Sequence, residues 1–93
     1  MDPNICIGEL ERIVEMGSAY IGPHGDPLAH AYGVASVLRD IASTDEQREN
    51  IAATVIEVKD WYKANQRSTE DGAAAKRPVA AAIAKLKRAY GAP

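Results

Sequence analysis

Apolar residues recur every three or four positions through most of this 93-residue chain. The clearest run is Ile51, Val55, Val58 and Tyr62, whose i, i+4, i+7, i+11 spacing places all four on one face of an α-helix. No stretch of useful length alternates between apolar and polar residues, as a half-buried strand would require. The pattern therefore predicts an all-α fold, in which each helix buries its apolar face against another helix.

Capping signals divide the chain into four helices. Asp-Pro pairs at residues 2–3 and 26–27 each place a capping carboxylate before a proline that suits the first helical turn. Thr44 with Gln47 three residues later matches a capping box, and Pro78 marks the start of the last helix. The predicted helices cover about 3–17, 27–42, 45–66 and 78–90.

Short connections between these segments predict a small four-helix bundle, antiparallel and up-and-down, formed by a single domain over 1–93. Residues 67–77 are predicted to be a flexible linker before the last helix. Gly72 weakens a helix there, and Pro78 restricts the backbone of the residue before it. The second helix has the broadest apolar arc and is predicted to be the most buried; its arc comprises Leu28, Ala31, Val34, Ala35, Val37, Leu38, Ile41 and Ala42.

The chain has no Phe, one Trp and many alanines, so its core contains few large side chains and self-association would bury more apolar surface. Cys6 is the only cysteine, which rules out an intrachain disulfide and favours a reducing compartment. The first residues, MDPNICIGEL, do not match a signal peptide, and no segment is apolar over about 18 residues as a membrane span requires. We therefore expect a cytoplasmic protein without a membrane partner.

Charge is unevenly distributed along the chain. Residues 1–62 carry eleven acids and four bases, whereas residues 63–93 carry seven bases and two acids, which together give the net charge of −2. This asymmetry predicts either internal pairing of the basic end with acidic helices or an external partner for one of them. The acidic faces of the first and third predicted helices consist of Glu9, Glu11, Glu15, Glu46, Glu49, Glu57 and Asp60.

From these features we expect a non-enzymatic helical protein that binds another macromolecule, as an adaptor, regulator or inhibitor of a larger protein. The acidic faces are its predicted contact surfaces, because a cationic protein surface would complement them. No cofactor is implied by any motif. Self-association is a further expectation.

An alternative function is association with nucleic acid through the basic end of the chain. The residues that would contact phosphates are Lys76, Arg77, Lys85, Lys87 and Arg88. The acidic pI of 5.6 and the lack of an aromatic-plus-basic platform place this alternative second.

A third alternative is metal-dependent hydrolysis by the acids of the third predicted helix. EQRE at 46–49 and EVKD at 57–60 resemble the two halves of the ExxE…ExxD signature of all-α MazG-type nucleotide pyrophosphohydrolases. In that family the halves lie on separate helices, whereas here seven residues separate them on one helix. His24 and His30 match no zinc-ligand spacing, so no metal site is predicted.

Overall fold

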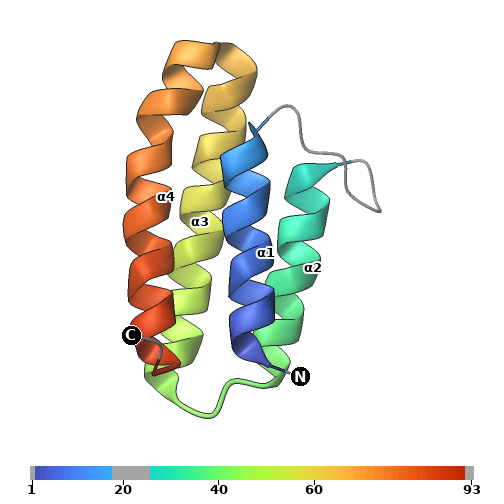
Figure 1. Ribbon diagram of the computed structural model, residues 1–93, viewed down its shortest axis with the longest axis vertical. Helices are drawn as coiled ribbons and strands as arrows, with labels where there is room; N and C mark the ends of the chain where they lie inside the picture. The colour runs from blue at the N-terminus through green and yellow to red at the C-terminus, as the bar shows by residue number, and fades with distance from the viewer. Residues whose placement is uncertain (1, 18–25, 92–93) are drawn as a thin grey trace.

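The computed structural model describes residues 2–17 and 26–91, which contain four α-helices. These are α1 (Pro3–Met16), α2 (Pro27–Asp40), α3 (Asp45–Arg67) and α4 (Thr69–Ala89). Successive helices run in opposite directions, and each lies beside the next, with α4 returning to pack against α1 (Figure 1). The all-α, antiparallel four-helix bundle expected from the sequence is confirmed. Residues 18–25, between the first two predicted helices, lie outside the described residues.

The predicted caps begin three of the helices. The carboxylates of Asp2 and Asp26 accept hydrogen bonds from the backbone N–H groups two residues later, at 2.9 and 3.0 Å. The hydroxyl of Thr44 accepts from the Gln47 N–H at 3.1 Å. The Gln47 side chain accepts in return from the Ser43 N–H, just before the helix, at 2.7 Å. Thr44 therefore satisfies a backbone donor that lacks an intrahelical partner, and Gln47 fixes the chain that enters α3.

The boundary predicted for the last helix is wrong. α4 begins at Thr69, so most of the predicted linker 67–77 is helical and Pro78 lies inside the helix. Ser68 separates α3 from α4, with an extended backbone and a hydroxyl that accepts from the Asp71 N–H at 3.0 Å. Acidic residues in the first turn and the run of alanines before Pro78 favour helix, and together they offset the hydrogen bond that the proline removes.

The core lies between the four helices and is built mainly from Ile, Leu, Val and Ala. Trp61 is its largest fully buried side chain, and Ile7, Ile13, Leu38 and Leu86 are also buried almost completely. α3 and α4 make the closest pair, because Gly72 has no side chain and lies directly against Asn65. A Cβ built at Gly72 would lie 2.9 Å from the Cα of Asn65.

The prediction that the second helix is the most buried is also wrong. Within α2 only Ala31, Ala35 and Leu38 are buried, and its other large apolar side chains are half-buried or exposed. The physical reason is the width of its apolar arc, since contacts with α1 and α3 cover only the middle of it. α2 therefore keeps an apolar margin on both of its flanks.

Candidate interaction surfaces

The junction between α1 and α4 takes up two of the five basic residues of the predicted nucleic-acid surface. The Nζ of Lys87 donates to the Glu11 carboxylate at 2.9 Å, and the Nζ of Lys76 donates to the backbone carbonyl of Glu15 at 3.4 Å. Both lysines line a groove between the two helices whose floor includes Val14 and Ile83. Lys76 and Lys87 therefore pair with α1 inside the molecule. This is one of the two interpretations that the charge asymmetry allowed.

Glu9 on α1 is also engaged within the molecule. Its carboxylate accepts from Arg12 at 3.0 Å and lies 3.2 Å from Nε2 of His30 on α2. The hydrogen bond from Arg12 lowers the pKa of Glu9, and the charge of Arg12 and the contact with His30 act in the same direction against partial burial. His30 thus joins α2 to α1. Of the three acids predicted as a contact face on α1, Glu9 and Glu11 already have cationic or imidazole partners.

The acids of α3 differ from those of α1. Glu46, Glu49 and Asp60 are exposed and Glu57 is half-buried, and within residues 2–17 and 26–91 none of the four forms an ion pair. We call these four residues the acidic stripe. The structure thus leaves the acidic stripe available to a cation from outside the molecule.

The spacing of the acidic stripe does not suit a metal centre. Its two pairs, residues 46–49 and 57–60, are about 12 Å apart along the helix axis, whereas the carboxylate ligands of Mg²⁺ share one ion at about 2.1 Å. Among the described residues no three His, Cys, Asp or Glu side chains are placed to hold one ion. The seven-residue interval of the sequence therefore separates the two halves of the motif in space.

The three remaining bases, Arg77, Lys85 and Arg88, are exposed on the side of α4 away from the core. Their level relative to α3 follows from contacts across the α3–α4 pair. Thr54 Oγ1 lies 3.5 Å from the Ala82 carbonyl, and these residues are each fourteen positions from Ser68. Residues of α3 and α4 that are equally far from Ser68 along the chain therefore lie at about the same height.

A second contact gives the same register: Gln47 Nε2 donates to the Ala89 carbonyl at 3.1 Å, and both residues are twenty-one positions from Ser68. By this register Asp60 lies within one residue of the height of Arg77, and Glu49 lies within one residue of the height of Arg88. Acids thus accompany the exposed bases along the bundle. They would repel a phosphate backbone laid along α4, which reduces the support for nucleic-acid binding.

Apolar side chains form a further surface on α2 and the helices beside it. Ile5 of α1, which is 70% exposed, shares a groove with Val34 and Val37 of α2. On the other flank Tyr32 of α2 is exposed and lies over the junction with α3, and Ile56 of α3 is 58% exposed. We call the surface they form the apolar band, and it consists of Ile5, Leu28, Tyr32, Val34, Val37, Val55 and Ile56.

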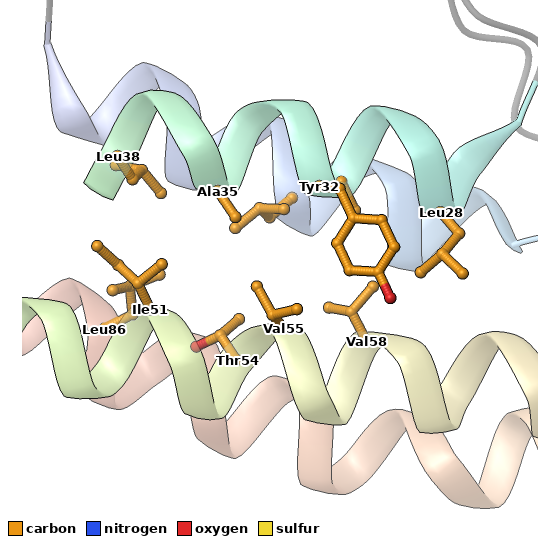
Figure 2. Close-up of a pocket in the computed structure, with 11 residues that line it drawn as sticks. Leu28, Tyr32, Ala35, Leu38, Ile51, Thr54, Val55, Val58 and Leu86 are labelled. Atoms are coloured by element: carbon orange, nitrogen blue, oxygen red, sulfur yellow. The ribbon is translucent and has the colours of Figure 1, made fainter. Parts of the chain in front are cut away.

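Beneath the apolar band, side chains of α2 and α3 point toward one another across a junction lined almost entirely by carbon (Figure 2). Leu28, Tyr32 and Ala35 come from α2, and Val55 and Val58 come from α3. The free volume in this junction is about 10 Å³. This is at the lower limit of the space that one water molecule needs, so the junction is no preformed small-molecule site.

Sequence patterns located the charged residues but not the apolar band. Ile5 and Ile56 fall outside the core faces of their helices, yet only the packing of the helices shows that both border α2. Among the described helices none is long and apolar enough to cross a membrane. No protein-family model, curated protein sequence or solved structure gives a significant match to this chain.

Proposed function

We propose that this chain is a non-enzymatic protein-binding domain that acts as an adaptor, regulator or inhibitor, and that its main contact surface is the apolar band. The observation that carries the proposal is the incomplete covering of α2. The apolar arc of α2 was broad enough to predict the most buried helix. Its margins nevertheless stay uncovered, beside the exposed Ile5 of α1 on one flank and the exposed Ile56 of α3 on the other. Exposed apolar side chains gathered on neighbouring helices are typical of protein-interaction sites.

The chemistry of the apolar band suits an apolar helix or strand from a partner protein. Tyr32 and the aliphatic side chains around it supply buried area, and aromatic residues are enriched at the centres of interfaces. Arg39 and Arg48 border the band on the α2–α3 side and would supply a polar rim. We infer that the partner contributes apolar side chains to the band and acidic side chains to this rim.

Affinity capture with point variants tests this proposal. Tagged wild-type protein and the variants Ile5→Lys and Ile56→Lys are incubated with lysate of the source cells, and bound proteins are compared by mass spectrometry. Met16→Lys is the matched control, because Met16 is also an exposed apolar residue but does not line the band. All three positions are exposed, so each variant should keep the helical circular dichroism spectrum of the wild type.

We expect a partner that is retained by the wild type and by Met16→Lys and is lost with Ile5→Lys and Ile56→Lys. A specific partner that remains bound to both band variants would contradict the assignment of the surface. In that case the acidic stripe is the next candidate.

The acidic stripe supports a second form of the same function, in which a cationic protein surface is the partner. It has the specific support that no cation of the described residues pairs with it. Nucleic-acid binding has less support, since Lys76 and Lys87 contact α1 and acids accompany the other bases. Hydrolysis at a metal ion has the least support, because the acidic stripe is too extended along α3 for its carboxylates to share one ion.

A further inference from the structure

The α3–α4 pair presents two lines of opposite charge on one side of the molecule. Glu57 follows Thr54 by one helical turn, so the acidic stripe adjoins the contact between α3 and α4. Lys85 follows Ala82 by three residues and adjoins the same contact from the other side. We call this surface the α3–α4 outer face, and it consists of Glu49, Ala53, Glu57, Asp60, Arg77, Ala81, Lys85 and Arg88.

The two lines of charge do not neutralise each other within one molecule. One ion pair joins α3 to α4, between Arg67 and Asp71 beside Ser68, and neither residue belongs to the outer face. Among the described residues no ion pair joins an acid of the outer face to one of its bases. Seven of the eight residues of the outer face are exposed, the exception being Glu57, which is half-buried. Each line of charge is therefore available to a surface of the opposite sign on another molecule.

We propose that this partner is a second copy of the chain, bound face to face through the α3–α4 outer face. A two-fold axis parallel to the helices and midway between them places α3 of each copy over α4 of the other. Such an axis leaves the height of every residue unchanged. Asp60 then faces Arg77 of the second copy, and Glu49 faces Arg88 of the second copy, because the residues of each pair lie within one residue of the same height.

The charge pattern also selects this arrangement against the other simple one. A two-fold axis perpendicular to the helices in the plane of the interface would place α3 over α3, and acids would face acids. Like charges brought together destabilise an interface, whereas the parallel axis gives opposite charges at both ends. Ala53 and Ala81 are small and exposed near the middle of the face, which allows the helices of the two copies to approach closely.

The proposal supplies the cationic partner of the second candidate function and therefore rests on the acidic stripe, not on the apolar band. Neither α1 nor α2 contributes to the outer face. A dimer formed in this way leaves Ile5 and Tyr32 open to another protein. Failure of the dimer would leave the assignment of the apolar band unchanged.

Sedimentation velocity tests the dimer with purified full-length protein. Wild type is measured up to about 1 mM protein, at about 20 mM and about 500 mM salt, since exposed ion pairs are screened at high salt. We expect a concentration-dependent monomer–dimer equilibrium that weakens at high salt. Wild type that stays monomeric at the highest concentration in low salt would overturn the proposal.

Charge reversals show whether the proposed pairs hold the dimer. We expect Asp60→Arg and Arg77→Glu each to weaken dimerisation at least about tenfold, because symmetry places every reversed charge twice in the interface. Asp40→Arg and Lys59→Glu are matched controls with the same changes in net charge, and neither residue belongs to the outer face. They should leave the equilibrium nearly unchanged.

The decisive measurement combines the reversals. The double variant Asp60→Arg/Arg77→Glu, and an equimolar mixture of the two single variants, should both recover dimerisation, because opposite charges again face each other. Weakening by the single variants without recovery in either combination would contradict the face-to-face pairing. Equal weakening by the control variants would attribute the effect to net charge alone. Circular dichroism of every variant verifies folding.

Discussion

Two glycines at the scale of single residues show how differently the same change can act in this bundle. Gly33 in α2 has open space around the position of a Cβ, whereas Gly72 in α4 faces the backbone of Asn65. Glycine inside a helix is costly because its unfolded chain has more freedom than that of alanine. At Gly33 that cost is avoidable. At Gly72 the same cost is unavoidable, because only a residue without a side chain allows α3 and α4 to approach so closely.

We therefore predict opposite effects of alanine at the two positions. Gly33→Ala should raise the free energy of unfolding by about 0.5–1 kcal/mol, through helix propensity alone. Gly72→Ala should lower it by about 1–3 kcal/mol, because a Cβ would meet Asn65 Cα at 2.9 Å and a helix would have to shift. Urea denaturation of both variants measures the difference. A stabilising effect of Gly72→Ala would mean that the two helices separate easily.

At the same scale, side chains that act on nearby backbone groups were predictable from the sequence. The carboxylates of Asp2 and Asp26 and the hydroxyl of Thr44 cap the helices that their positions indicated. The Gln47 side chain was expected to bond near Thr44, and it does so through the Ser43 N–H. Its second bond, to the Ala89 carbonyl, depends on the packing of α4 and could not be predicted.

At the scale of elements, α4 shows that several helix-favouring features together can outweigh one strong signal against a helix. Pro78 argues for a helix start, and taken alone it would break a helix at a cost of about 3 kcal/mol. The Ser68 cap, the acids of the first turn and burial of Ala75 and Val79 against the bundle all favour helix from Thr69. A sequence pattern does not show that α4 packs along the full length of α3, so the prediction of a linker at 67–77 was wrong.

The apolar face of α4, not its charge, should hold the helix in the bundle. Leu86 is only 1% exposed, and Leu86→Ala should lower the free energy of unfolding by about 2–5 kcal/mol through lost contacts and a cavity. Lys85→Ala should change it by less than about 0.5 kcal/mol, because Lys85 is exposed. Thermal or urea denaturation of the pair checks this prediction. Equal effects at the two positions would show that α4 is not docked.

At the scale of the whole molecule, the bundle is asymmetric. α3 and α4 form a close pair of long helices, whereas α1 and α2 are shorter and leave apolar surface at their margins. The fold class and the direction of each helix follow from caps and periodicity. The apolar band and the outer face do not, because both depend on which helices become neighbours and at what height.

One hydrogen bond crosses the bundle diagonally and gives a test of its cooperativity. The Tyr90 hydroxyl donates to the Leu38 carbonyl at 3.1 Å, which joins the end of the chain to α2. Tyr90→Phe should lower the free energy of unfolding by about 0.5–1.5 kcal/mol at pH 7. Urea denaturation of the variant and the wild type measures this difference.

The effect of Tyr90→Phe should depend on pH. Burial raises the pKa of Tyr90 above its ordinary value, so the folded protein favours the neutral phenol. The stabilisation is complete below the pKa of the unfolded chain, about 10, and is lost as the pH rises through the higher folded value. The difference between variant and wild type should therefore shrink in alkaline solution. A difference that stays constant there would show that the hydroxyl is not buried.

The single residue between α3 and α4 has a consequence for the topology of the chain. Only the extended backbone of Ser68 separates 23 residues of helix from the next 21. With helical dihedral angles at this one position, the two segments would form a continuous rod about 67 Å long, since each residue adds about 1.5 Å. The reversal of direction on which the bundle depends is thus decided by two torsion angles and one serine hydroxyl.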